Sequence, residues 1–163
     1  MRKVYTGKGD RGVTTDFSGK RIRKDNQIIV TGGKIDALQS AIDTARVHAK
    51  QKERRALERI QTKLWQLSAE ISHCDQKCLV APIVDSDLRE IEQQINTLGE
   101  PSATFFRFTN TRAIAYNECR IRARELETYL APFLRKKKLR PVAYRYINRL
   151  SSYFFMLAYR SRG

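Results

Sequence analysis

The residues at the start of the chain have the types and spacing of a phosphate-binding loop. Gly7, Gly9 and Gly12 are interleaved with a lysine, an aspartate and an arginine, and two threonines follow. Glycines let the backbone turn several N–H groups toward one point, and hydroxyls and cations complete a cradle for a polyphosphate. It is not a Walker A loop, because no Gly-Lys-Ser/Thr element follows these glycines. A flexible basic arm ahead of the fold has the same composition.

Polar side chains also interrupt two later apolar patterns. Arg120, Arg124 and Glu127 are spaced so that one face of a helix would carry all three. Asn148 and Arg149 lie inside the apolar pattern near the end of the chain. Each set also has a purely structural interpretation. The charged stripe could be an exposed, ion-paired face, and a buried Asn148 amide could fix the register of its helix.

The composition limits the class of protein. A length of 163 residues predicts one domain with a sizeable core. The formal net charge is +15, from 32 Lys and Arg against 17 Asp and Glu, which would attract nucleotides, nucleic acid or an anionic membrane surface. No apolar run reaches the roughly 20 residues of a membrane span, and no signal-peptide pattern follows Met1. We therefore expect a cytoplasmic protein.

The cysteines argue against a disulfide framework and against a metal site. There are three, Cys74, Cys78 and Cys119, and an odd number without a secretion signal favours free thiols. His73 precedes the first of them, but the spacing is not that of a zinc knuckle and no second pair completes it. The sequence thus predicts no protein-bound metal.

Helices must position most of these residues, because apolar side chains recur at helical spacing almost throughout the later sequence. The pattern predicts helices at about 35–45, 57–71, 88–98, 111–130 and from 141 onward, joined by short linkers. We therefore predict an all-α fold, a five-helix bundle at 32–163 preceded by a glycine-rich basic arm at 1–31, together forming one domain.

Several residues predict where these helices begin and end. We expect Asp85 or Ser86 to cap the third helix, Gly99 to end it, and Pro132 to stop the fourth. Trp65 lies next to the apolar stripe of the second helix, which predicts a place in the core or in an interface.

Five blocks of the sequence, taken together and in order, resemble the PduO-type ATP:cob(I)alamin adenosyltransferase family. They are YTGKGDRG at 5–12, GKRIRKD at 19–25, GKIDALQS at 33–40, AYNECRIRARELE at 115–127 and YINRLSSYFF at 146–155. The separation of Glu127 from Asn148 agrees with the family without a gap, and the resemblance covers nearly the whole chain.

The resemblance implies a fold, a reaction and an assembly. The fold would be a five-helix bundle, which agrees with the pattern of apolar residues. The reaction would transfer the 5′-deoxyadenosyl group of ATP to the cobalt of cob(I)alamin, forming adenosylcobalamin and releasing triphosphate, with Mg²⁺ accompanying ATP. The protein would be a homotrimer with an active site at each subunit interface, and 1–31 would be its ATP-binding arm.

The resemblance also implies roles for individual residues. Those that would surround the triphosphate are Thr6, Gly7, Lys8, Gly9, Asp10, Thr14 and Thr15. Lys24 and Arg124 would pair with phosphate oxygens. Glu127 and Asn148 would hold the nucleoside or order Arg124. Asp36 and Arg120 match a family salt bridge that closes the base of the corrinoid cleft, and Phe105 or Phe106 matches an aromatic residue beside the lower corrinoid face.

The sequence departs from the family pattern at several positions. Gly7-Lys8 replaces Lys-Thr, Val30 replaces an acidic residue, and Ala37, Glu125 and Ser152 replace Glu, Arg and Asp respectively. These changes leave open a divergent relative that binds ATP or a corrinoid without efficient transfer. A basic helical nucleic-acid binder is a third hypothesis, suggested by the net charge and by the basic run 135–138. Against it, no known DNA-reading motif appears, and most aromatic residues fall on apolar helix faces.

Overall fold

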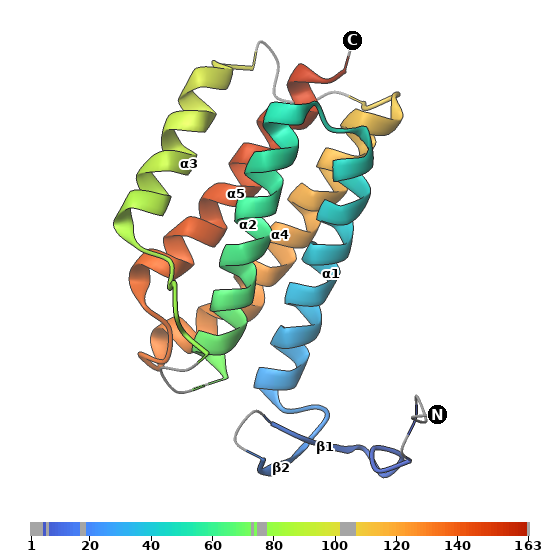
Figure 1. Ribbon diagram of the computed structural model, residues 1–163, viewed down its shortest axis with the longest axis vertical. Coiled ribbons are helices and arrows are strands. Elements are labelled where there is room, and N and C mark those ends of the chain that lie inside the picture. Colours follow the sequence, from blue (N-terminus) through green and yellow to red (C-terminus); the bar gives the residue numbers. More distant parts are fainter. Residues whose placement is uncertain are drawn as a thin grey trace.

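The chain folds into a helical bundle with a small hairpin at its N-terminal end (Figure 1). The computed structural model describes residues 5, 7–16, 19–72, 74, 78–101 and 107–162. The helices in this part of the chain are α1 (Gln27–His48), α2 (Gln51–Ile71), α3 (Asp85–Leu98), α4 (Thr111–Arg135) and α5 (Pro141–Arg160). The strands are β1 (Val13–Thr15) and β2 (Arg21–Arg23). The predicted five-helix bundle is confirmed, whereas the two-stranded sheet was not predicted.

The bundle is held together by helices that pack side by side. α4 and α5 pack along each other, α1 packs on α4, α2 on α1, and α3 on α5 (Figure 1). Their facing side chains are apolar and fully buried, as Leu38, Leu64, Leu126 and Phe154 illustrate. Each such side chain stabilises the fold by about 1.5–3 kcal/mol relative to an exposed one. The regular spacing of these residues is what made the helices predictable.

The helix ends agree only in part with the predictions. Gly99 ends α3 in a left-handed conformation, with φ 77°, as expected. Val84 precedes α3 as its N-cap, and its N–H donates to Asp87 Oδ2 at 2.9 Å, so the prediction of Asp85 or Ser86 as the cap was wrong. α4 also continues past Pro132 to Arg135. A proline removes only one N–H near the end of the helix, and the next residue, Phe133, packs in the core.

The structure also corrects the prediction of free thiols at two cysteines and narrows the prediction for Trp65. Cys74 and Cys78 form a disulfide in the linker between α2 and α3, where their Cα atoms lie 5.8 Å apart, within the range that a disulfide spans. Cys119 is a free thiol, buried in α4. Trp65 is 71% exposed on α2, so it is not a core residue; its place in an interface stays a prediction.

The hairpin presents the glycine-rich segment at the foot of the bundle. β1 and β2 pair antiparallel, with Thr14 opposite Ile22. The turn between them contains Gly19 at φ 83°, and Asp16 Oδ1 accepts from the N–H of Lys20 at 3.0 Å. Asn26 then caps α1 by accepting from the N–H of Ile28. In the described residues, the helices all fall short of the length and apolar character that crossing a bilayer requires.

Candidate functional site

The first group of predicted residues lines a cleft in the hairpin segment, which we call the hairpin cleft. Its volume is about 860 Å³, and it is lined by Gly7, Lys8, Gly9, Arg11, Val13, Thr14, Thr15 and Arg21. Gly7 and Gly12 have φ values of 68° and 72°, which L side chains rarely adopt. Successive turns, closed by Asp10 N–H to Gly7 O and Gly12 N–H to Gly9 O, curl this backbone into a loop.

Lys24 crosses this loop beside Gly9. A Cβ atom at Gly9 would lie only 3.0 Å from Lys24 Nζ, so glycine is what lets the ammonium group come so close to the backbone. The N–H of Lys24 donates to Gly12 O at 2.9 Å, which fixes the strand end from which the side chain starts. The structure therefore brings the predicted cation to the predicted glycine loop.

A second cleft lies on the α4–α5 face, and we call it the lower cleft. Its volume is about 720 Å³, and it is lined by Arg124, Glu125, Glu127, Thr128, Ala131, Pro132, Arg135, Tyr144 and Asn148. Asn148 Nδ2 donates to Glu127 Oε1 at 2.6 Å, and the Tyr144 hydroxyl donates to the same oxygen at 3.5 Å. Partial burial, and then the charge of Glu127, raise the pKa of Tyr144, so this phenol keeps its proton.

The orientation of the Asn148 amide is set by a residue that sequence reasoning did not assign. Arg149 Nη1 donates to Asn148 Oδ1 at 2.9 Å, and Arg149 Nε donates to Glu92 Oε1 on α3 at 2.9 Å. The amide oxygen therefore faces Arg149 and the amide nitrogen faces Glu127. The position of Arg149 directly after Asn148 was the one available signal for this contact.

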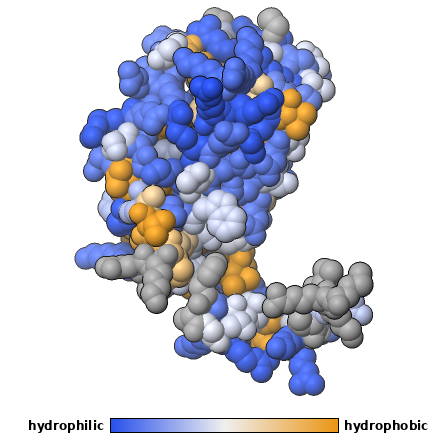
Figure 2. Space-filling view, viewed as in Figure 1, coloured by the Kyte–Doolittle hydropathy of each residue, from blue (hydrophilic) through white to orange (hydrophobic). Residues whose placement is uncertain are grey.

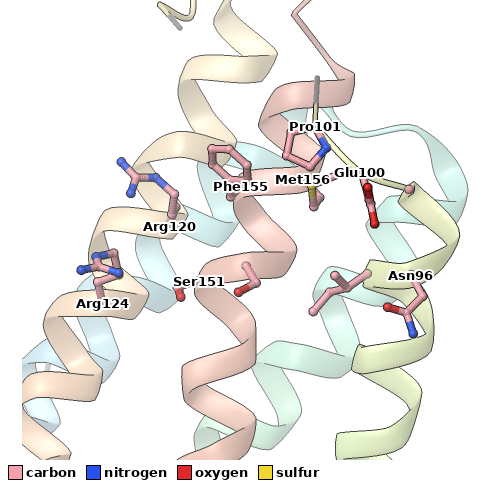
Figure 3. A pocket seen from close by; sticks show the side chains of 11 residues that line it. Asn96, Glu100, Pro101, Arg120, Arg124, Ser151, Phe155 and Met156 are labelled. Atoms are coloured by element: carbon pink, nitrogen blue, oxygen red, sulfur yellow. The ribbon is translucent and has the colours of Figure 1, made fainter. Parts of the chain in front are cut away.

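A third cleft, the upper cleft, lies farther along α4 and α5 (Figure 3). Its volume is about 640 Å³, and it is lined by Ile95, Asn96, Gly99, Glu100, Pro101, Arg120, Arg124, Ser151, Ser152, Phe155 and Met156. Figure 3 shows Arg120 and Arg124 one turn apart on α4, on the side of α5 from which Phe155 projects. Arg124 lines both the upper and the lower cleft, so its guanidinium stands between them.

The sequence matches the family described as cobalamin adenosyltransferase over residues 4–161. The chain belongs to the cobalamin adenosyltransferase family. A corrinoid adenosyltransferase of Citrobacter freundii is 34% identical over 97% of this chain and 94% of its own length. The corrinoid adenosyltransferase PduO of the same species is 32% identical over 95% of this chain, which spans only 48% of that relative.

A solved structure has the same fold. A variant of the PduO-type ATP:corrinoid adenosyltransferase from Lactobacillus reuteri, complexed with cobalamin and ATP, superposes with a TM-score of 0.83. The match covers 98% of this chain and 91% of the other at 22% identity. The resemblance to the PduO-type family that the sequence blocks indicated is therefore confirmed, and so is the bundle.

Glu125 stands where the family pattern has an arginine, and the structure shows how its charge is compensated. Lys34 Nζ of α1 lies 2.7 Å from Glu125 Oε1 and 5.1 Å from the centroid of the Tyr129 ring. Arg122 Nη1 lies 3.3 Å from Glu125 Oε2. The hydrogen bond with Lys34 lowers the pKa of Glu125, and the same bond raises the pKa of Lys34. An ion pair between α1 and α4 thus accompanies this departure.

Some predicted site residues are not brought together within one chain. Asp36 is exposed on α1, and no ion pair joins it to Arg120 within the described residues. Arg120 Nε instead donates to Asn117 Oδ1 at 2.8 Å. Thr6, Phe105 and Phe106 lie outside the described residues. The hairpin cleft shares no lining residue with the two clefts on α4 and α5.

Proposed function

We propose that this chain transfers the 5′-deoxyadenosyl group of ATP to the cobalt of cob(I)alamin, forming adenosylcobalamin and releasing triphosphate. Membership in the family and the names of its relatives support the reaction class. The observation that carries the proposal to this chain is the position of Arg124, between a polar cleft with the Glu127–Asn148 pair and a cleft with exposed apolar surface.

The reaction depends on the positioning of the two substrates more than on proton transfer. The electron pair of Co(I) attacks C5′, the Co–C bond forms, the C5′–O bond breaks, and the electrons leave with the triphosphate oxygen. Co(I) is a very strong nucleophile, so the protein has to align C5′ with cobalt and stabilise the charge on the departing triphosphate. Cations and oriented N–H groups are suited to this task.

The nucleotide would occupy the hairpin cleft and the lower cleft. Loop N–H groups, the Thr14 and Thr15 hydroxyls and Lys24 would surround the triphosphate, and Arg124 would bind it from α4. The Asn148 amide engages Glu127 Oε1, so the second carboxylate oxygen of Glu127 can accept from a ribose hydroxyl. In this proposal residues 1–31 are the ATP-binding arm of a single domain, although α1 itself begins at Gln27.

The corrinoid would occupy the upper cleft. Phe155 and Met156 offer apolar surface, and the exposed Ser152 offers a hydroxyl for the polar edge of the ring system, whereas the Ser151 hydroxyl already donates to Asn148 O. Pro101 lies at this cleft and leads into the segment that carries Phe105 and Phe106. An aromatic ring from that segment would stand beside the lower corrinoid face and displace the lower axial ligand.

The site would be completed by a neighbouring subunit in a homotrimer. The hairpin lies beyond the foot of the bundle, and its cleft shares no residue with those on α4 and α5 (Figure 1). A hairpin from one subunit placed over α4 and α5 of the next would join Lys24 with Arg124. The same contact would let Asp36 of one subunit meet Arg120 of another, an ion pair that the described single chain does not form.

Magnesium would enter with ATP. No group of three His, Cys, Asp or Glu side chains suited to a metal ion occurs in the described part of the chain. Mg²⁺ usually keeps several waters and binds through substrate phosphates, which fits a cleft made mainly of donors and cations. Phosphate oxygens and water would therefore supply most of its ligands.

The decisive experiment is an adenosyltransferase assay of the full chain with Mg-ATP and chemically reduced cobalamin. The wild type should form adenosylcobalamin, and Arg124→Ala should lose at least tenfold in kcat/KM, or about 1.4 kcal/mol of transition-state stabilisation. Arg145→Ala, an exposed cation on α5 that lines none of the three clefts, is the control.

Two other outcomes would change the conclusion. If ATP and cobalamin bind in calorimetry but no product forms, the chain is a relative that binds its ligands without transfer. If neither ligand binds, both functions are excluded.

A further inference from the structure

A row of hydrogen bonds behind the lower cleft joins three helices. Glu92 of α3 accepts from Arg149 Nε, and Arg149 Nη1 donates to Asn148 Oδ1, both at 2.9 Å. Asn148 Nδ2 in turn donates to Glu127 Oε1 of α4 at 2.6 Å. Asn148 and Glu127 line the lower cleft, whereas Glu92 and Arg149 line none of the three clefts. The latter two therefore reach the lower cleft through Asn148 and not directly.

The Asn148 amide satisfies its neighbours in only one of its two orientations. In the present one its oxygen faces the guanidinium of Arg149 and its nitrogen faces the carboxylate of Glu127, so both contacts are favourable. A half-turn about the last side-chain bond would place donor against donor and acceptor against acceptor. The orientation of the amide therefore depends on the guanidinium staying where it is.

Arg149 is a long, flexible side chain that needs a second contact to stay in place. It is 39% exposed, so rotamers that lead into water are open to it. Glu92 takes the Nε–H and leaves Nη1 directed at Asn148, because the donors of a planar guanidinium have fixed directions. Glu92 is itself placed by the packing of α3 on α5. A carboxylate 57 positions away in the sequence thus holds the guanidinium that orients the amide.

We propose that Glu92 and Arg149 are positioning residues for the nucleotide, which hold the Asn148 amide so that Glu127 keeps one carboxylate oxygen for the ribose. This inference rests on the proposed function, because it gives both residues a role in binding ATP without touching it. When Glu92 is absent, the guanidinium is free to leave and the amide is free to turn. Glu127 then loses the donor that orders its carboxylate, and the nucleotide binds less tightly.

Positioning and charge predict opposite effects for the loss of Glu92. Its carboxylate is a negative charge near a site for an anionic nucleotide, so its removal would, by electrostatics alone, strengthen the binding of ATP. Loss of the positioning contact would weaken it. Glutamine at this position separates the two effects further, because its amide oxygen can still accept from Arg149 Nε although the charge is gone. The sign of the change in affinity therefore identifies the role.

Steady-state kinetics of the full chain with Mg-ATP and cob(I)alamin tests the role. Glu92→Ala should raise the KM for ATP about fivefold, the effect of one lost hydrogen bond, and leave the KM for cob(I)alamin unchanged. Glu92→Gln should stay within about twofold of the wild type, because it keeps the acceptor. Glu90→Ala is the matched control, since Glu90 lies on the same helix and pairs with Arg59 of α2 at 2.9 Å, outside the lower cleft. Its KM for ATP should not rise.

A double-mutant cycle shows whether Glu92 acts through Asn148. In Asn148→Ala the amide is already gone, so the addition of Glu92→Ala should raise the KM for ATP no further. Calorimetric titration of ATP into the same variants gives the affinity without turnover and should show the same pattern. Circular dichroism shows that each variant is folded.

The possible results separate this inference from the function on which it rests. Suppose that the wild type forms product. The positioning role is then excluded, and the proposed function stands, if Glu92→Ala keeps or lowers the KM for ATP, or if Glu92→Gln or Glu90→Ala loses as much as Glu92→Ala. A loss that persists undiminished in the Asn148→Ala background excludes the role as well.

Two further results would also overturn the inference. An increase in the KM for cob(I)alamin in place of that for ATP would show that Glu92 serves the upper cleft, whose residues Ile95 and Asn96 lie one turn farther along α3. If the wild type neither binds ATP nor forms product, the proposed function fails and the positioning role fails with it.

Discussion

The Glu127–Asn148 hydrogen bond shows how single side chains define the lower cleft. At 2.6 Å it is a short bond to a carboxylate oxygen, and Arg149 holds the amide in the orientation that this bond needs. Asn148 supplies a donor without adding charge. Within this hydrogen-bonded pair the negative charge therefore belongs to Glu127 alone, and in the proposed function it would face the nucleoside.

Replacing the Asn148 amide by a carboxylate should therefore impair nucleotide binding. In Asn148→Asp two carboxylates would face each other at the present hydrogen-bond distance, and their repulsion would also oppose the anionic nucleotide. We expect the KM for ATP to rise at least tenfold, with a smaller change in kcat. Steady-state kinetics with ATP as the varied substrate measures this. Asn96→Asp, which adds the same charge to the upper cleft, is the control, and an unchanged KM for ATP in Asn148→Asp would contradict the assigned role.

The Lys34–Glu125 ion pair makes the stability of the protein depend on pH at both extremes. The pKa of Glu125 is lowered by Lys34, so its contribution is present above the unfolded pKa, near 4.3, and is lost as pH falls through the folded value. The pKa of Lys34 is raised, so its contribution is present below about 10.4 and is lost as pH rises further.

Thermal melts of the wild type and Glu125→Gln from pH 3 to pH 9 test this pair. The variant should melt at a lower temperature than the wild type between pH 6 and 9, and the difference should shrink as the pH falls through the lowered folded pKa of Glu125. A difference that is the same at pH 3 and pH 7 would show that the carboxylate charge is not its cause.

Among the secondary-structure elements, the helices were predictable and their ends were less so. Apolar spacing reports which face of a helix is buried, and it predicted the bundle directly. The cap of α3 depends instead on a carboxylate that reaches back to Val84, and the extension of α4 past Pro132 depends on the packing of Phe133. The hairpin was missed because each strand has only three residues, too few for an alternating pattern.

In the candidate site, too, some features could be predicted from the sequence and others could not. Arg124, Glu127 and Asn148 were singled out from sequence, and they line one cleft because helical spacing and helix packing place them there. The Lys34–Glu125 contact joins residues 91 positions apart, so no local pattern could indicate it.

The end of α3 is a place where one glycine matters. Gly99 has φ 77°, and a Cβ atom there would lie 2.6 Å from Nη2 of Arg160. The Arg160 side chain is held in that place because its Nε donates to Leu98 O at 2.6 Å. Gly99→Ala should therefore destabilise the fold by about 1 kcal/mol or more. Gly32→Ala, at a helical position in α1 with open space around it, should instead stabilise the fold by about 0.5–1 kcal/mol. Urea denaturation measures both, and the same sign for both would contradict this account.

At the level of the whole molecule, the net charge says which ligands are attracted but not what the protein does with them. The net charge of +15 draws any polyanion toward the protein, and the visible face of the molecule is mostly hydrophilic (Figure 2). Charge alone therefore does not distinguish a nucleotide enzyme from a nucleic-acid binder. The match to the cobalamin adenosyltransferase family over residues 4–161 does, and it favours the nucleotide enzyme.

The proposed trimer can be tested by mixing two inactive chains. Lys24→Ala damages the hairpin cleft and Arg124→Ala damages the clefts on α4, and each variant alone should lose at least tenfold in activity. If each site combines the hairpin of one chain with α4 of its neighbour, trimers containing both variants have some sites free of either change. Random assembly of equal amounts makes about a quarter of all sites intact, so co-expressed chains should recover about a quarter of wild-type activity.

The opposite arrangement gives a different result in the same experiment. If the hairpin served α4 of its own chain, every site in every mixed assembly would carry one of the two changes, and co-expression would restore nothing. Each variant carries a different affinity tag, and two successive affinity purifications, one for each tag, retain only assemblies that contain both variants. Light scattering then gives the mass of these assemblies. Mixed trimers with no more activity than either variant would exclude a site shared between subunits, whereas a recovery that follows the fraction of mixed assemblies would establish one.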